Sequence, residues 1–445
     1  MVTLYKAKTK SSLVKSTLTL DIDSSDYEVN GLGRYKQKIA FVSGALPGEK
    51  VQAVVLEDKA GFIKARTSKV LSASAERQRP FCPHFNQCGG CQLQYLDNDQ
   101  QIRLKQQGVD QLIRHQTGLA SLPWQSMITG PDTHYRRKAR LGVWYDKKSR
   151  RLSVGFRAEG SKAITAINEC SMLSPQLAPA VTLLPPVIRA LPDPTIITHL
   201  EIFTAGGQPY VVVRHVKPLT AAQQQSFITG WPQACFLGDD GTEQLQPWQA
   251  GTPVPAYTLS EQNVTLQFQP GDFIQINEVV NQQMVSQALA WLQINASDVV
   301  LDLYAGIGNF SLAMARYAKT VQGIEGVAKM VQQAATNATL NGLSNVSFAQ
   351  ADLHLPWPAA PWALQRYTKV VLDPARAGAQ GAIAQVAALK AAQILYVSCN
   401  AATFARDAKV LLEQGYRLEK LAGVDMFPHT SHLELMALFS LPAKQ

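Results

Sequence analysis

The last third of the chain alternates short apolar segments with segments of helix length, and this rhythm restricts the possible folds more than any other feature. Five apolar segments have the length and composition of buried strands: residues 299–303, 320–325, 346–349, 369–373 and 393–398. Apolar strands that alternate with helices form parallel sheets covered by helices on both faces. From about residue 286 onward, the chain is therefore predicted to be an α/β domain with a doubly wound sheet.

The first part of the chain shows short strands between turns instead. Residues 18–22, 38–42 and 51–56 are predicted strands, while Asn30-Gly-Leu-Gly and Leu46-Pro-Gly-Glu are predicted turns between them. Closely spaced strands of this kind favour a small β-barrel. With its recurring Lys and Arg residues, the segment resembles a TRAM domain, which is a small OB-like barrel that binds RNA.

Length and composition predict three domains in a cytoplasmic protein. The 445 residues suggest about three domains, at roughly 150 residues each. The predicted divisions are residues 1–74 for the barrel, 75–270 for a mixed α+β central domain, and 271–445 for the doubly wound domain. The hydrophobic fraction of 46% excludes a disordered chain, and no apolar run has membrane-spanning length. No membrane association, secretory signal or obligate protein partner is expected.

Positive charge is concentrated at the front of the chain. Residues 1–170 carry 27 Lys and Arg against 15 Asp and Glu, whereas the remaining residues carry 15 against 18. This asymmetry indicates a polyanionic partner bound by the front of the molecule. A basic surface that only aids solubility is the alternative.

A glycine-containing turn after the first predicted parallel strand indicates a nucleotide site. Tyr304-Ala-Gly-Ile-Gly-Asn309 follows that strand, at the sheet edge where doubly wound folds bind nucleotides. Ser311 occupies the place of the third glycine in dinucleotide-binding motifs, which argues against NAD. Glu325 ends the next strand and is suited to ribose hydroxyls, and Asp352 follows the third strand and is suited to an adenine amino group. The series resembles the S-adenosylmethionine site of class I (Rossmann-like) methyltransferases; ordinary turn residues are the alternative.

Two further strand ends carry groups suited to covalent chemistry. Asp373-Pro-Ala-Arg follows the fourth strand, and Cys399 follows the fifth. A thiol is not needed to methylate an amine, but C5 of a pyrimidine is too weak a nucleophile to take a methyl group unaided. Addition of a thiolate to C6 activates C5, and a base must then remove the C5 proton. Glu434 is the candidate base; a structural carboxylate, or a metal site with His429 and His432, are the alternatives.

Three segments together resemble the RNA 5-methyluridine methyltransferases. They are Asp373-Pro-Ala-Arg-Ala-Gly, Tyr396-Val-Ser-Cys-Asn-Ala-Ala-Thr and Asp425-Met-Phe-Pro-His-Thr-Ser-His-Leu-Glu. The resemblance implies that Cys399 is the nucleophile and Glu434 the base. It also implies a set of contacts to S-adenosylmethionine from Gln275, Tyr304, Asn309, Glu325, Asp352 and Asp373.

A cysteine cluster in the central segment indicates a metal centre. Cys82, Cys88 and Cys91 are closely spaced, and Cys170 follows much later. Four thiolates suit either zinc or an iron–sulfur cluster, and His84 could compete as a ligand. The spacing resembles the [4Fe-4S] site in the 23S rRNA branch of the same family, and that resemblance implies Cys170 as the fourth ligand.

The resemblance covers nearly the whole chain and implies methylation of uracil C5 in 23S rRNA. The run Tyr135-Arg-Arg-Lys-Ala-Arg140 is predicted to contact RNA, with a solvated charged strand as the alternative. Three other functions remain open at this point. They are methylation of tRNA or another rRNA site, a non-catalytic iron–sulfur protein that binds RNA during assembly, and a redox enzyme that uses a nicotinamide cofactor.

Overall fold

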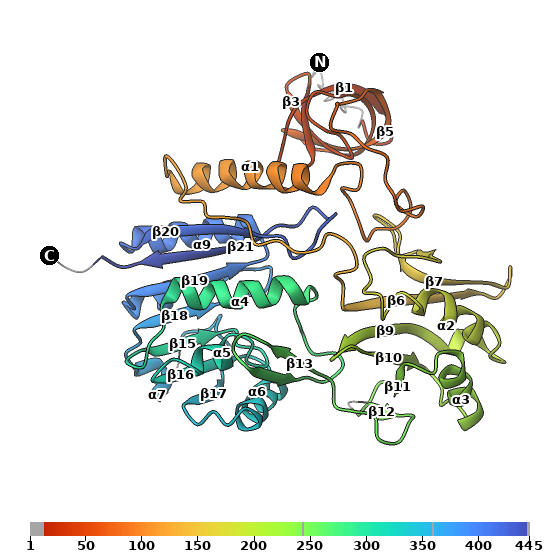
Figure 1. Cartoon of the computed structure of the whole chain (residues 1–445). Coiled ribbons are helices and arrows are strands. Elements are labelled where there is room, and N and C mark those ends of the chain that lie inside the picture. Colours follow the sequence, from red (N-terminus) through yellow and green to blue (C-terminus); the bar gives the residue numbers. More distant parts are fainter. Residues whose placement is uncertain (1–12, 243, 358–359, 443–445) are drawn as a thin grey trace, which may run out of the picture. The chain divides into compact units, whose positions relative to one another are not determined.

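Figure 1 shows a computed structural model of the protein, which describes residues 13–442 except 243, 358 and 359. The first twelve residues of the predicted barrel segment and the last three of the predicted doubly wound segment lie outside this range. The chain divides into two compact units. Unit 1 contains residues 1–80 and 92–111, and unit 2 contains residues 81–91 and 112–445. None of the helices formed by the described residues is long and apolar enough to cross a membrane.

Unit 1 contains a closed five-stranded barrel. Its strands follow the order β1-β2-β3-β5-β4, with bounds β1 Thr17–Ser25, β2 Gly31–Tyr35, β3 Lys38–Ser43, β4 Lys50–Asp58 and β5 Phe62–Ser72. Side chains alternate between the buried interior and the surface, so that Leu18, Leu20 and Ile22 of β1 all enter the core. This period-two pattern is what closes an apolar interior around short strands. The predicted barrel is confirmed.

The predicted turn at Asn30-Gly-Leu-Gly is wrong, because Gly31 and Gly33 belong to strand β2. Glycine is needed at both positions for another reason, which is that strand β1 approaches them closely. A Cβ atom on Gly31 would lie 2.8 Å from Cγ2 of Ile22, and one on Gly33 would lie 2.5 Å from the carbonyl oxygen of Asp21. Glycine within a strand often marks such a contact.

A buried ion pair ties the segment after the barrel to the barrel itself. The side chain of Glu49 is fully buried and accepts hydrogen bonds from the backbone N–H groups of Leu46 and Ser74. It also pairs with Arg77, whose Nε lies 2.5 Å from Oε1. Burial alone would raise the pKa of Glu49, but the hydrogen bonds from Arg77 and the two backbone groups outweigh it and lower the pKa.

Arg77→Ala is expected to destabilise unit 1 by about 3–5 kcal/mol, because it leaves a buried carboxylate without its cation. The free energy of unfolding, measured by urea denaturation, tests this. Because the pKa of Glu49 is lowered in the folded state, the stabilisation should be present at neutral pH and be lost as the pH falls below 4.5. Arg79→Ala, at an exposed position, is the matched control. Equal stability of the two variants would contradict this account.

Unit 2 begins its sheet structure with seven strands in the order β12-β11-β10-β9-β6-β7-β8. The bounds are β6 Lys138–Asp146, β7 Arg151–Arg157, β8 Ile164–Ala166, β9 Ile197–Ala205, β10 Gln208–His215, β11 Cys235–Asp239 and β12 Gln246–Pro247. Helices α2 (Ala180–Arg189) and α3 (Ala221–Gly230) accompany this sheet, with the short η1 turn (Pro194–Ile196) ahead of β9. Helix α1 (Asn98–Thr117) precedes them in the chain, and its residues up to 111 belong to unit 1.

The second large sheet of unit 2 confirms the predicted doubly wound fold. Its order is β17-β16-β15-β18-β19-β21-β20, and the strands from β15 to β19 run parallel. The bounds are β15 Val299–Leu303, β16 Thr320–Glu325, β17 Val346–Gln350, β18 Lys369–Leu372, β19 Gln393–Ser398, β20 Arg417–Val424 and β21 Glu434–Ser440. A hairpin of β13 (Ala256–Leu259) and β14 (Val264–Gln267) leads into this region.

Helices cover both faces of this sheet. Helix α4 lies across one face and α9 lies behind the other (Figure 1). The helices are α4 Glu278–Leu292, α5 Ser311–Ala315, α6 Ala328–Leu340, α7 Pro361–Leu364, α8 Ile383–Ala388 and α9 Ala401–Glu413. Side chains of α4 and α5 share one apolar core with strands β15, β18 and β19. The strand order reverses between β15 and β18, which is where doubly wound folds bind their ligands.

Candidate active site

The carboxyl ends of the parallel strands bring the predicted site residues to one edge of the second sheet. Tyr304, Glu325, Asp373 and Cys399 each end or directly follow one of these strands. Strand β21 runs antiparallel to β19, and its Leu435 pairs with Ser398. Glu434, the first residue of β21, therefore lies at the same edge as Cys399.

Cys399 is half-buried between strand β19 and helix α9. Asn400 caps that helix, and its Oδ1 accepts hydrogen bonds from the N–H groups of Ala402 and Thr403 at 2.9 and 3.3 Å. Burial raises the pKa of the Cys399 thiol to about 11. The negative charges of Glu434 and Asp373 raise it too, and Arg376 opposes them. The thiol is therefore protonated at neutral pH, and Arg376 is the nearby group that favours the thiolate.

Glu434 is a buried carboxyl whose second oxygen has no hydrogen-bond partner. The residue is 5% exposed, and Oε2 is the oxygen left without a partner among the described residues. Burial, and to a smaller extent Asp373, raise the pKa of Glu434 to about 8 against the opposing effect of Arg376. A carboxyl with a pKa near neutrality suits proton transfer, and buried unpaired carboxyls are rare outside functional sites.

The alternatives for Glu434 find no support in the geometry. No ion pair involves Glu434 within the part of the chain that the structure describes, so it is not a salt-bridged carboxylate. Its two histidine neighbours in the sequence have other contacts. Nε2 of His429 lies 3.6 Å from Oδ2 of Asp132, and Nε2 of His432 lies 2.9 Å from the guanidinium of Arg376. These contacts do not form a metal site.

Arg376 is a functional candidate to which the sequence reasoning assigned no role. Its side chain is exposed, contacts His432, and lowers the pKa of both Cys399 and Glu434. The signal was present, because Arg376 closes the segment that begins with Asp373. What the sequence could not reveal is that the guanidinium acts on both reactive groups at once.

Glu325 and Tyr304 border the glycine turn after β15. The Glu325 carboxylate accepts hydrogen bonds at 3.0 Å from the N–H groups of Gly306 and Val327. Tyr304 has a left-handed backbone with φ of 63°, and its hydroxyl is buried without a hydrogen-bond partner among the described residues. A non-glycine residue in this conformation is strained, and such strain is typical of ligand sites. Asp352, which follows strand β17, is exposed, and its carboxylate accepts a hydrogen bond from the N–H of His354.

Hydrogen bonds connect the remaining predicted residues to the same edge. Oδ1 of Asn309 accepts from the Tyr257 hydroxyl at 3.0 Å and from Nδ2 of Asn281 at 3.1 Å. Nε2 of Gln275 donates to Oδ2 of Asp373 at 3.4 Å. Burial raises the pKa of Asp373 to about 7. The segment ahead of helix α4 is thus joined to the end of strand β18.

Asp302 explains the serine that interrupts the dinucleotide-type motif. Its buried carboxyl accepts a hydrogen bond from the hydroxyl of Ser311, the residue at the place of the third glycine. Burial raises the pKa of Asp302 to about 7, against the effect of this hydrogen bond. The serine therefore supports the turn, a role the sequence pattern did not indicate.

The cysteine segment is held by hydrogen bonds to neighbouring loops of unit 2. The N–H of Cys88 donates to the carbonyl oxygen of His84 at 2.8 Å, and Nε2 of His84 lies 2.7 Å from Oδ1 of Asn168. Asn168 lies two residues before Cys170, so this contact joins the two segments that carry the four thiols. It also engages Nε2, one of the two ring nitrogens with which His84 could serve as a ligand.

The four cysteines have the thiolate chemistry that a metal centre requires, but the metal centre itself stays a prediction. Burial raises the pKa of Cys88, and the charges of Cys170 and Cys82 raise it further, so these three thiols are electrostatic neighbours. The N–H of Gly90 lies 3.4 Å from the sulfur of Cys88, a contact of the kind that tunes iron–sulfur thiolates. Across the described residues, no group of three or more His, Cys, Asp or Glu side chains is arranged to hold a metal ion.

The predicted RNA contact at residues 135–140 is wrong for two of its members. Tyr135 is 6% exposed and donates its hydroxyl to the carbonyl oxygen of Pro428. Arg137 is 2% exposed, donates to the carbonyl oxygen of Gln275 and lies over the ring of Tyr257. Both residues lie just ahead of strand β6, and their contacts with segments far away in the sequence bury them, which a count of basic residues cannot reveal.

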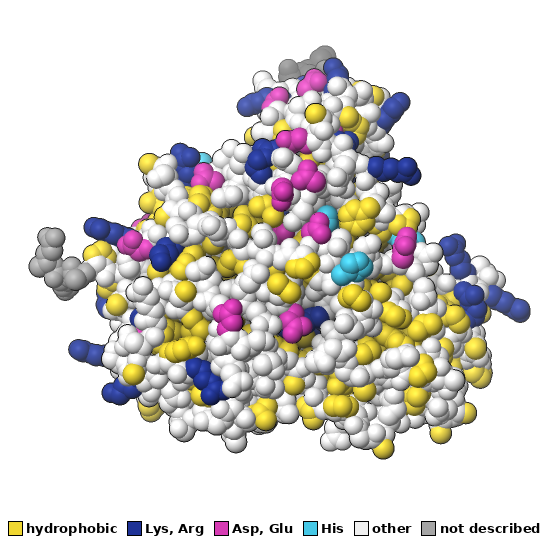
Figure 2. All heavy atoms as spheres, in the orientation of Figure 1, with side chains coloured by type: hydrophobic (Ala, Val, Ile, Leu, Met, Phe, Trp, Pro, Cys, Tyr) yellow, Lys and Arg dark blue, Asp and Glu magenta, His cyan; other side chains and the backbone are white. Residues whose placement is uncertain are grey.

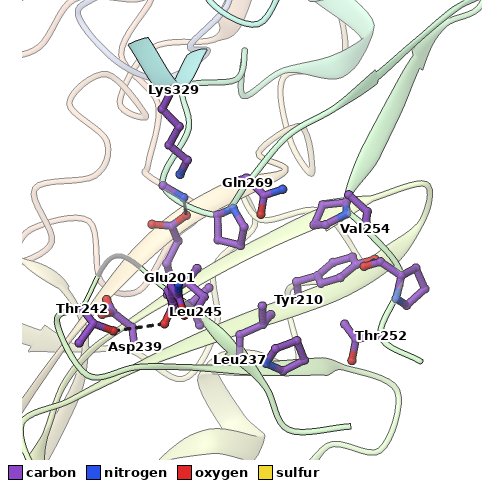
Figure 3. A pocket seen from close by; sticks show the side chains of 17 residues that line it. Glu201, Tyr210, Leu237, Asp239, Thr242, Leu245, Thr252, Val254, Gln269 and Lys329 are labelled. Atoms are coloured by element: carbon purple, nitrogen blue, oxygen red, sulfur yellow. Dashed lines mark hydrogen bonds between the residues drawn. The ribbon is translucent and has the colours of Figure 1, made fainter. Parts of the chain in front are cut away.

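Figure 3 shows a separate pocket of about 610 Å³ between the first sheet and the segment ahead of Phe273. Glu201 and Asp239 line it from the strands, and Lys329 lies across from them. Both carboxylates already have cations: Lys138 lies 3.1 Å from Glu201, and Arg214 lies 2.5 Å from Asp239. None of the predicted site residues lines this pocket.

Comparison with known proteins identifies the family. The chain is 41% identical over 442 residues to "23S rRNA (uracil(1939)-C(5))-methyltransferase RlmD" of Vibrio parahaemolyticus, with 99% of each chain covered. The chain belongs to the RlmD family of methyltransferases. The RlmD protein of Photorhabdus laumondii is 40% identical, with 99% of this chain and 100% of the relative covered. A profile described as "tRNA (Uracil-5-)-methyltransferase" matches residues 255–353 and 362–440.

A solved structure has the same fold as this RlmD family member. It is the tRNA (uracil-54, C5)-methyltransferase of Pyrococcus abyssi, in complex with S-adenosyl-L-homocysteine. The TM-score is 0.71 at 20% sequence identity, and the match covers 95% of this chain and 100% of the other. The likeness establishes the α/β methyltransferase fold.

Proposed function

We propose that the protein transfers a methyl group from S-adenosylmethionine to C5 of one uridine in 23S rRNA, the position that its relatives' name gives as uracil 1939. The observation that carries the proposal is the pairing of a half-buried thiol with a buried, unpaired carboxyl at the sheet edge. The RlmD relatives are named for this activity, and their similarity to this chain covers nearly its full length.

The chemistry we propose divides between two side chains. Cys399 gives its proton to solvent and its sulfur adds to C6 of the uracil, which forms an S–C6 bond. The electron pair of the C5–C6 π bond passes to C5 and makes it a nucleophile. C5 then takes the methyl group, which S-adenosylmethionine supplies from its sulfonium. Glu434 removes the proton from C5, and the electron pair of that C–H bond expels the Cys399 sulfur. Methylated RNA is released with the C5–C6 double bond re-formed, and the Cys399 thiolate takes up a proton from solvent to become the thiol again.

Arg376 supports the first of these steps in the proposed mechanism. Its cation opposes the rise in the pKa of Cys399 that burial causes. Asp373 and Glu434 act in the opposite direction, so Arg376 offsets part of the effect of the two carboxyls on the thiol. The half-buried position of Cys399 limits the water that competes for this charge.

For the S-adenosylmethionine site we propose the residues that the family resemblance implied. Glu325 would bind the ribose hydroxyls and Asp352 the adenine amino group, while Tyr304 and Asn309 border the glycine turn. Gln275 and Asp373, which are joined by a hydrogen bond, would contact the reactive end. Both carboxylate oxygens of Glu325 already accept backbone N–H groups, which fixes the orientation of its side chain.

We also propose the three-part division predicted from the sequence, with residues 1–74 binding RNA, 75–270 carrying the iron–sulfur cluster and 271–445 carrying the methyltransferase site. The basic front of the chain supports the first assignment, since phosphate binding depends on Lys and Arg. An enzyme that modifies ribosomal RNA belongs in the cytoplasm, without a membrane or an obligate protein partner.

Mapping of 5-methyluridine in 23S rRNA tests the proposed function. Cells that lack the gene should lose the modification at one uridine, and the wild-type gene should restore it. Complementation with Cys399→Ala is the matched control, which should leave the uridine unmodified. Loss of 5-methyluridine from tRNA instead, with 23S rRNA unchanged, would contradict the proposed substrate.

Cys82, Cys88, Cys91 and Cys170 are the proposed ligands of a [4Fe-4S] cluster. Protein purified without oxygen is expected to be brown and to contain about four irons per chain. Replacing Cys88 with serine should remove most of the iron, whereas Cys235→Ser should not. Measured by iron analysis and visible absorbance, stoichiometric zinc in a colourless, active preparation would contradict the assignment.

A further inference from the structure

We propose that the β6–β7 hairpin is an RNA-binding surface outside the active site, where Trp144 stacks on an unpaired base and the basic turn binds the adjoining phosphates. We call Trp144, Lys147, Lys148, Arg150 and Arg151 the hairpin surface. The inference rests on the proposed function, since it takes rRNA as the substrate. It assigns part of the excess positive charge of residues 1–170 to one defined surface.

Trp144 occupies a strand position that is normally polar. Along β6 the neighbouring residue Val143 is buried and Tyr145 packs against the core of the first sheet, so that Trp144 points the other way. Its side chain is 65% exposed. The residue opposite it on β7 is Ser153, which is too small to cover an indole ring. Core packing therefore does not explain the tryptophan, and its ring is accessible for stacking.

The turn beside this ring carries four exposed cations, Lys147, Lys148, Arg150 and Arg151. Within the described residues, none of the four takes part in an ion pair. The acid of the turn, Asp146, is engaged locally, because its carboxylate accepts from the Lys148 N–H and the Ser149 hydroxyl, both at 2.8 Å. Figure 2 shows Lys and Arg side chains gathered at the margin where this hairpin lies in Figure 1.

The composition of the hairpin surface favours RNA over protein as the partner. Lysine is depleted at protein interfaces, whereas a group of four exposed cations, of which only Lys147 is recorded near an acid outside the turn (Asp193), suits a phosphate backbone. An exposed aromatic ring beside such cations is the arrangement with which proteins bind single-stranded nucleic acid. By contrast, Arg137 and Lys138 at the start of the same strand already bind the carbonyl oxygens of Gln275 and Asp272. The cations available to phosphate therefore lie at the turn.

Three variants of the full-length protein test the inference, with an unmodified 23S rRNA transcript as the probe. Changing all four cations of the turn to glutamine should weaken RNA binding roughly tenfold or more. It should also flatten the salt dependence, by about 0.7 in log–log slope for each phosphate that is no longer neutralised. Trp144→Ala should weaken binding roughly fivefold to a hundredfold at an unchanged salt slope, and Trp144→Phe should restore most of it. In both cases KM for RNA should rise while kcat at saturating RNA stays at the wild-type value.

Matched controls come from the edge of the second sheet that is opposite to the candidate active site. Lys319, Arg366, Lys390 and Arg417 are exposed cations at or just before the amino ends of strands, and Tyr317 is an exposed aromatic residue. Glutamine at those four positions, or Tyr317→Ala, should leave RNA affinity nearly unchanged. The proposal is overturned if the hairpin variants bind RNA as the control variants do, or if they lose kcat without a change in affinity. This outcome can be told apart from a failure of the proposed function, because in that case the wild-type protein itself would not methylate the transcript.

Discussion

Cys399→Ala is expected to reduce methylation of 23S rRNA by several orders of magnitude, as loss of the nucleophile does in other enzymes with covalent intermediates. Without the thiolate, C5 of uracil has no activated form that can take the methyl group. The fold should be unaffected, because the side chain is small and only half-buried. Single-turnover transfer of radiolabelled methyl groups to the RNA transcript measures the loss.

Cys235→Ala provides the control for this substitution. Cys235 is also a half-buried thiol, and it lies on strand β11 of the other sheet. Its removal should leave methyl transfer within about twofold of the wild-type rate, since surface and peripheral changes act weakly. A Cys399→Ala enzyme that retains a tenth or more of the wild-type rate would show that the thiol is not the nucleophile.

Glu434→Gln is expected to stop the reaction after methyl transfer rather than before it. The amide cannot accept the C5 proton, so RNA should remain bonded to Cys399 through C6. Loss of a general base costs about 10²–10⁴ in rate. With ordinary uridine RNA, the variant should therefore accumulate a protein–RNA adduct that survives denaturing electrophoresis and disappears slowly. Glu413→Gln, at an exposed position on α9, is the control and should form no lasting adduct.

The pH dependence of product release follows from the same carboxyl. Burial raises the pKa of Glu434 to about 8, and only the ionised form accepts a proton. The release rate should therefore rise with pH up to and slightly beyond 8, and should be roughly a hundredfold lower at pH 6 than at its plateau. Rapid release by Glu434→Gln, or a rate that is flat from pH 6 to pH 9, would assign the proton transfer to another group, with Asp373 the next candidate.

The sequence predicted the parts of the fold that depend on periodicity. The five apolar strands were recognisable because both faces of a parallel sheet are buried, which leaves continuous apolar runs. The strand-end residues Tyr304, Glu325, Asp373 and Cys399 followed from this, since parallel strands end at a common edge. Strand β2 was missed because Gly31 and Gly33 read as a turn, although they allow β1 to approach closely.

The parts that could not be predicted depend on side-chain surroundings. Tyr135 and Trp144 lie nine positions apart, yet Tyr135 is buried and donates its hydroxyl to the carbonyl oxygen of Pro428, whereas Trp144 is exposed opposite Ser153. Burial of Glu434, which raises its pKa to about 8, requires the antiparallel return of β21 beside β19. The contact of Arg376 with His432 joins residues 56 positions apart.

The most direct test of the central claim is to trap the enzyme on RNA that carries 5-fluorouridine at the target. Cys399 can add to C6 and C5 can be methylated, but fluorine replaces the proton that Glu434 must remove, so the reaction should stop at a covalent complex. We expect this complex to require S-adenosylmethionine, to survive denaturation, and to yield by mass spectrometry a peptide in which Cys399 is joined to methylated fluorouracil. A complex that forms equally well with Cys399→Ala, or one joined through another residue, would contradict the account.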